Sequence, residues 1–80
     1  MNAVYEIQWT EYERGWGQRP DGKSYHVDKQ TADKFIADYN ETQPKDHVPD
    51  EYSQPGIPKL VEVSDELFKK VKKAKSVWTN

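Results

Sequence analysis

The chain of 80 residues contains no cysteine, so neither disulfide bonds nor thiolate metal ligands can stabilise its fold. It also has no apolar run long enough to span a membrane. Its first residues, Met1 to Val4, lack the basic segment and following apolar segment of a secretion signal. We therefore expect a single domain over residues 1–80, located in the cytoplasm and without membrane contact.

Residues typical of catalysis and metal binding are also scarce. No glycine-rich phosphate loop is present, and no serine lies in a nucleophile elbow. His26 has the outward parity of a strand, where an imidazole is usually a solvated surface group. Asp46, His47, Asp50 and Glu51 cluster in sequence, but a proline-rich loop does not bring three or four donors together around a metal. We predict no enzymatic activity, no catalytic residue, no metal site and no cofactor.

Aromatic residues are abundant, and each of them can remove a large area from water. The ten are Tyr5, Trp9, Tyr12, Trp16, Tyr25, Phe35, Tyr39, Tyr52, Phe68 and Trp78. We expect them to form much of the core of a domain near the lower size limit for independent folding. Self-association would enlarge such a core, so a homodimer is one expected state.

Charge is unevenly distributed along the chain. Residues 1–66 hold 7 Lys and Arg against 14 Asp and Glu, whereas residues 67–80 hold 5 Lys and no acid. The basic segment suits a polyanionic partner, and equally an acidic surface on its own body or on a second copy.

Alternating apolar and polar residues predict two strands, at residues 4–10 and 24–27, which pair as a hairpin. Tyr5, Ile7 and Trp9 share one face of the first strand. Tyr25 and Val27 are expected to point inward from the second.

Two helices are predicted from caps and spacing. The first is capped by Asp28 or Thr31, and the second by Ser64. Their inner residues are Ala32, Phe35, Ile36 and Tyr39 in the first helix, and Leu67, Val71, Ala74 and Trp78 in the second. Between the helices, residues 41–58 form a proline-rich connecting loop and residues 59–63 a third strand. That loop is expected either to be pinned to the body by Val48, Tyr52 and Ile57 or to take part in binding.

These elements predict a small α+β domain of order ββαβα. The expected sheet has three strands in the order 2-1-3, with both helices covering one face. Two strand edges remain open, and dimerisation through an edge is one alternative.

The candidate site is the segment that joins the first two strands. Gly15 and Gly17 bracket Trp16, and residues 20–22 (Pro-Asp-Gly) have the composition of a turn, so we expect a shaped loop. Arginines beside an exposed tryptophan suit a protein surface or a flat anion. The alternative is that Trp16 folds back and caps the core. The predicted binding residues are Tyr12, Arg14, Trp16, Arg19, Asp21, Lys23 and Tyr52.

Three partners fit this composition. A protein would use Trp16 and the arginines as binding hot spots. A nucleotide-like anion would use Arg14, Arg19 and Lys23 for phosphate and an aromatic ring for the base. Nucleic acid would bind the lysine-rich second helix, which we consider less favoured because that helix has no arginine to read a base edge.

The motif Tyr12-Glu13-Arg14-Gly15-Trp16-Gly17, followed downstream by residues 48–52 (Val-Pro-Asp-Glu-Tyr), resembles small uncharacterised proteins of bacteriophages and prophages. The resemblance covers about a dozen positions and carries no catalytic residue set. It implies a bacterial host cytoplasm and a role in host takeover or in counteracting host defence, by stoichiometric binding to a host protein.

Overall fold

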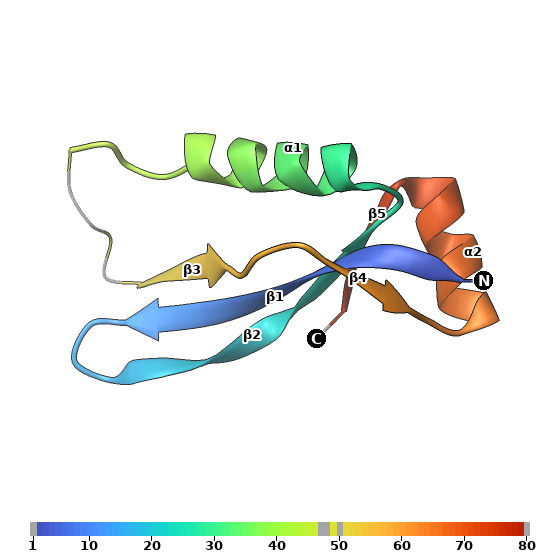
Figure 1. The fold of residues 1–80 in the computed structure, drawn as a ribbon. Helices are drawn as coiled ribbons and strands as arrows, with labels where there is room; N and C mark the ends of the chain where they lie inside the picture. Colours follow the sequence, from blue (N-terminus) through green and yellow to red (C-terminus); the bar gives the residue numbers. More distant parts are fainter. Residues whose placement is uncertain (1, 47–48, 50, 80) are drawn as a thin grey trace.

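The computed structural model describes residues 2–46, 49 and 51–79 (Figure 1). In chain order the elements are β1 (Ala3–Glu13), β2 (Gly17–His26), α1 (Lys29–Glu41), β3 (Glu51–Pro55), β4 (Lys59–Glu62), α2 (Asp65–Ala74) and β5 (Ser76–Thr79). The fold is therefore α+β, with five strands and two helices instead of the predicted three and two. His47, Val48 and Asp50, which entered the predictions above, lie outside the described residues.

β1 is the central strand, and every strand pair is antiparallel. β2 lies along one edge of β1, while β3 and β4 follow each other along the other edge (Figure 1). β5 extends the sheet beyond β2, giving the order β3-β1-β2-β5 with β4 also on β1. The predicted strand at residues 59–63 does pair with β1, but the order 2-1-3 lacks β3 and β5. β3 arises within residues 41–58, where an irregular loop was expected.

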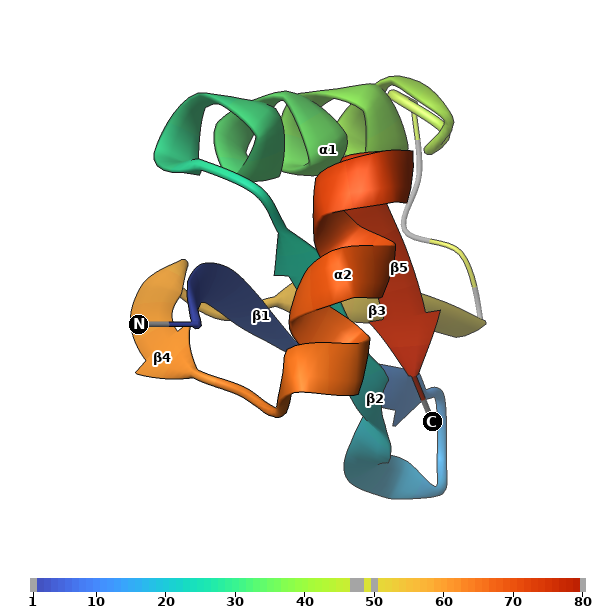
Figure 2. The same cartoon turned by 90° about the vertical axis from the view of Figure 1, so that its right-hand side faces the viewer.

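The two helices cover opposite faces of the sheet, which corrects the prediction of one covered face. Successive side chains of a strand point to opposite faces. Ile7 and Trp9 pack with Ala32 of α1, whereas Val4 and Tyr25 pack with Val71 of α2. We call these two surfaces of the sheet the α1 face and the α2 face. Figure 2 shows α1 across one side of the strands and α2 standing against another.

α1 follows its sequence pattern closely. Its N-cap is Asp28, whose side chain accepts a hydrogen bond from the Thr31 backbone N–H at 2.7 Å, so Thr31 is not the cap. The inner side of the helix packs on Ile7 and Trp9, with Trp9 in edge contact with Phe35 and Tyr39. All four predicted inner residues of α1 are confirmed in this cluster.

α2 begins as predicted, because the Ser64 side chain accepts from the Leu67 N–H. It ends at Ala74, earlier than the periodicity predicted. Lys75 has a φ of 73°, which turns the chain out of the helix and into β5. Trp78 therefore lies on a strand, where its ring contacts Trp9 at 5.6 Å between centroids, and Ala74 is exposed.

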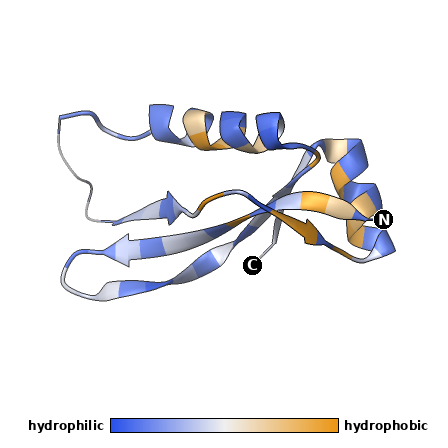
Figure 3. Ribbon diagram, in the orientation of Figure 1, coloured by the Kyte–Doolittle hydropathy of each residue, from blue (hydrophilic) through white to orange (hydrophobic). Residues whose placement is uncertain are grey.

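The molecule is elongated, with principal extents of 42 × 23 × 17 Å. We call the outer ends of β1, β2 and β3, at residues 10–22 and 51–54, the arm. The arm is mostly hydrophilic, while apolar residues gather on β4, α2 and the first half of β1 (Figure 3). No helix in the described part of the chain is both long and apolar enough to cross a membrane.

Candidate functional site

The arm ends in a tight turn. β1 runs to Glu13 and β2 begins at Gly17, so only three residues connect them, fewer than the long loop predicted. The Trp16 N–H donates to the Glu13 carbonyl at 3.0 Å, with Gly15 between them at a φ of 84°. A β-turn with positive φ at its third residue requires glycine. A Cβ at Gly15 would meet no atom within 4 Å, so backbone conformation, not space, demands glycine there.

Trp16 stands at the tip of this turn and is 82% exposed. The alternative that it caps the core is thereby excluded in this structure. Hollows open to solvent adjoin its ring: one of about 460 Å³ is lined by Glu13, Arg14, Trp16 and Glu51. A large apolar ring held in water on a short turn has no role in the core.

The α1 face of the arm is acidic. Glu13 lies directly opposite Glu51 of β3, and Glu11 lies opposite Arg19, with which it forms an ion pair at 3.0 Å. Partial desolvation, and then the hydrogen bond and charge of Glu51, raise the pKa of Glu13. This surface suits cationic groups better than anionic ones.

Asp21 does not belong to a turn, in contrast to the prediction for residues 20–22. It is the extra residue of a β-bulge in β2, where the register shifts between Trp9 and Thr10. Its carboxylate accepts a hydrogen bond from the Ser53 hydroxyl at 2.6 Å, which ties β2 to β3 across β1. Asp21 therefore has a structural contact that explains its presence.

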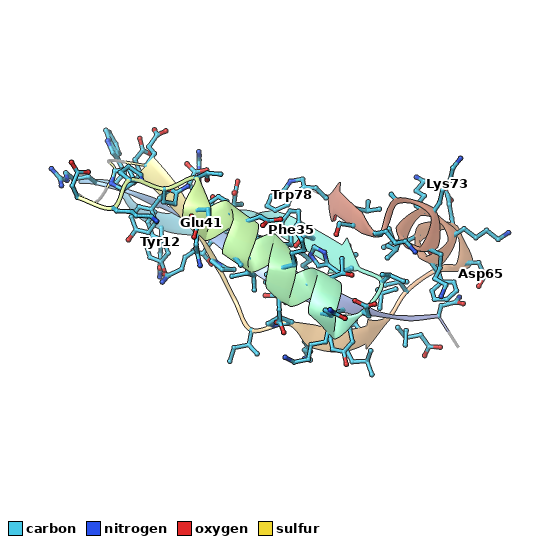
Figure 4. All side chains as sticks on the ribbon, turned by 90° about the horizontal axis from the view of Figure 1, so that it is seen from above. Tyr12, Phe35, Glu41, Asp65, Lys73 and Trp78 are labelled. Atoms are coloured by element: carbon cyan, nitrogen blue, oxygen red, sulfur yellow. The ribbon has the colours of Figure 1, made fainter. Side chains whose placement is uncertain are left out.

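On the α2 face of the arm, Tyr12 and Tyr52 are paired across β1 and β3. Their rings stack with centroids 5.3 Å apart and planes 14° apart. With Glu13, Arg14 and the backbone of Gly15 and Gly17, they line a hollow of about 590 Å³. Figure 4 shows Tyr12 near one end of the molecule.

The structure thus brings part of the predicted site together. Tyr12, Arg14 and Tyr52 line one hollow, and Trp16 adjoins it along the chain. Arg19 and Lys23 do not line this hollow; with Asp21 they line a neighbouring open groove of about 870 Å³.

The sequence did not predict a buried series of hydrogen-bonded side chains. His26 is fully buried, contrary to the predicted solvated position. Its Nε2 lies 2.8 Å from Ser24 Oγ and its Nδ1 2.7 Å from Ser76 Oγ, while Trp9 Nε1–H donates to Ser24 Oγ at 2.8 Å. Burial lowers the pKa of His26. Its position along β2 was the signal that could have indicated burial, because His26 lies opposite Tyr5 and therefore on the α1 face.

Among residues 2–46, 49 and 51–79, no three side chains of His, Asp or Glu converge as metal ligands would. A scan against protein-family models found no matching family, and searches of curated proteins and of solved structures found no match. The geometry of the arm is therefore the basis for a functional conclusion.

Proposed function

We propose that the tip of the arm binds another protein stoichiometrically, with Trp16 as its central contact. The observation that carries this proposal is the 82% exposure of Trp16 on a short, glycine-defined turn. Tryptophan and arginine are the residue types most often found as binding hot spots. A turn with fixed backbone angles has little backbone entropy left to lose on binding.

The neighbouring residues favour a protein surface as the target. The acidic pair Glu13 and Glu51 lies on one side of the tip, and the Tyr12–Tyr52 stack lies on the other. A partner that surrounds the tip would meet apolar, aromatic and charged groups within one patch, as protein interfaces do. The resemblance to phage proteins makes a bacterial host protein, including a component of a defence system, the partner class that we propose, with inhibition as the result.

The test is affinity capture from bacterial lysate with three forms of the protein: wild type, Trp16→Ala and Ile57→Ala. Ile57 is a matched control because it is 89% exposed and lies between β3 and β4, outside the arm tip. We expect Trp16→Ala to weaken capture by about 2 kcal/mol or more, roughly thirtyfold in affinity.

Circular dichroism should give the same spectrum for all three forms. The proposal requires one host protein to be retained by wild type and Ile57→Ala and lost with Trp16→Ala. Equal retention by a folded Trp16→Ala variant would contradict it, and so would the absence of any retained protein.

A second candidate is sequestration of a nucleotide-like anion. The hollow beside the Tyr12–Tyr52 stack favours it, because the hollow combines two aromatic rings with Arg14 and exposed glycine backbone. Arg14→Ala should then abolish saturable binding in a nucleotide panel, while Arg19→Ala, whose arginine does not line this hollow, should reduce it little. Equal effects of both substitutions, or no binding by wild type, would count against this candidate.

A further inference from the structure

The α2 face of the arm is a sheet surface that no helix covers. α2 packs only on its inner end, through Val4, Tyr25 and Val71. Beyond Tyr25 the surface forms an open groove of about 870 Å³, which reaches Gln18. Gln18 also lines the hollow beside the stacked tyrosines, so the two hollows are neighbours along the arm.

The two faces of the sheet differ in charge. Of the acidic residues in the described strands, only Glu6 lies on the α2 face, where its partner in β4 is Lys59. Strand register and the Asp21–Ser53 bond place the other carboxylates on the α1 face. These are Glu11, Glu13, Asp21, Glu51 and Glu62, of which Asp21 also lines the groove and Glu13 the hollow beside the tyrosines.

Apart from Asp21 and Glu13 at the two hollows, the side chains that the α2 face offers are neutral or basic. Its side chains include amides, hydroxyls, one lysine and the tyrosine pair, contributed by Gln8, Thr10, Tyr12, Gln18, Lys23, Tyr52 and Gln54. Amides and hydroxyls donate and accept hydrogen bonds without adding charge. Both tyrosines line their hollow, so an aromatic base entering it would extend an existing stack.

α2 adds positive charge at the inner end of the same face. It packs against Tyr25, which lines the groove, and carries exposed lysines on its outer side. Lys70 pairs loosely with Glu66, at 3.6 Å, and Lys72 lies over the Phe68 ring. Lys69 and Lys73 form no ion pair with any residue that the structure describes. Figure 4 places Lys73 at the end of the molecule opposite Tyr12.

We propose that the α2 face of the arm, together with the lysines of α2, binds single-stranded nucleic acid. Single strands are held without sequence preference by aromatic platforms for the bases and basic surface for the phosphates, and this face provides both. A duplex hides its base faces, so the tyrosine pair favours a single strand. This site shares the Tyr12–Tyr52 stack with the proposed protein contact but does not include Trp16.

Fluorescence anisotropy with labelled oligodeoxythymidine and oligouridine of about 12 nucleotides tests the proposal, since single-strand sites span roughly 4–16 nucleotides. We expect saturable binding at low salt that weakens steeply as salt rises, because phosphate contacts release counterions. Replacing both tyrosines, as Tyr12→Ala with Tyr52→Ala, should weaken binding about tenfold or more. A second pair, Tyr12→Leu with Tyr52→Leu, keeps apolar bulk and removes only the aromatic faces.

Two matched double substitutions of lysine distinguish binding at this site from nonspecific attraction of nucleic acid to positive charge. Lys69→Gln with Lys73→Gln should weaken binding and reduce the salt slope, by roughly 0.7 for each phosphate that is no longer neutralised. Lys29→Gln with Lys34→Gln makes the same charge change on α1, over the other face, and should change binding little. Trp16→Ala should leave binding unchanged.

Three results would overturn the proposal: no saturable binding of either strand at low salt, equal weakening by the two lysine pairs, or unchanged affinity in the folded tyrosine variants.

Discussion

At the residue scale, the most consequential departure from expectation is His26. A histidine with both ring nitrogens bonded to serine hydroxyls, and an aromatic ring 4.7 Å away at Phe35, is held as a neutral imidazole. The chain from Trp9 through Ser24 and His26 to Ser76 links β1, β2 and β5 inside the core. A polar chain of this kind stabilises the fold only while every member keeps its partner.

The buried imidazole predicts a pH dependence of stability. Burial lowers the pKa of His26 below its ordinary value of 6.5, so the folded state binds this proton less readily than the unfolded state. The contribution of neutral His26 is complete above pH 6.5 and is lost as pH falls through the folded-state pKa. The loss can reach about 1.4 kcal/mol per pH unit.

Urea unfolding at pH 7.5 and pH 5.0 measures this effect in wild type and in His26→Phe. We expect a smaller loss of stability between the two pH values in the variant. His47 is present in both proteins and cancels in the comparison. The same pH dependence in both proteins would show that His26 is not held neutral by the fold.

At the element scale, the sequence predicted the strands and helices that are defined by residues close together in the chain. β1, α1 and the start of α2 follow from alternation, helical spacing and the caps Asp28 and Ser64. β3 could not be predicted in this way, because residues 51–55 are short, end in Pro55 and are defined by pairing with β1. Its Ser53 N–H donates to the Tyr39 hydroxyl at 2.9 Å, a contact that depends on where α1 packs.

The two-sided packing of the sheet also depended on long-range contacts. Val4 and Val61 face α2, whereas Ile7 and Trp9 face α1, so apolar residues occupy both parities of β1. Alternation was visible over residues 5–9, but the role of Val4 depends on where α2 packs. Part of the candidate site was predictable for a different reason: Gly15, Trp16 and Gly17 define a turn locally.

The position at which α2 ends can be tested by whether a glycine substitution raises or lowers the stability of the protein. Lys75 has a φ of 73°, which is unfavourable for a residue with a side chain, so Lys75→Gly should stabilise the protein by about 0.5–1 kcal/mol. If the helix instead continued toward Trp78, glycine in its interior would destabilise by a similar amount. Lys73→Gly, inside α2, is the matched control and should destabilise by about 1 kcal/mol. Thermal and urea unfolding measure both.

At the scale of the whole molecule, the residues that form the core and the residues proposed to bind a partner lie in different parts of the fold. The core lies between the helices and the inner halves of β1 and β2, while the arm extends beyond α1 with little apolar content (Figure 3). The bulge at Asp21 and the stack of Tyr12 on Tyr52 hold its three strands together. The arm is therefore a three-stranded support that places Trp16 at one end of a molecule 42 Å long.

The most direct test of protein binding by the arm tip is native mass spectrometry of the protein after passage through bacterial lysate, with Trp16→Ala measured in parallel. We expect a discrete complex of the chain with one host protein, and its loss in the variant. A spectrum of wild type that contains only the free chain, or the chain with a ligand of a few hundred daltons, would contradict protein binding by the arm tip.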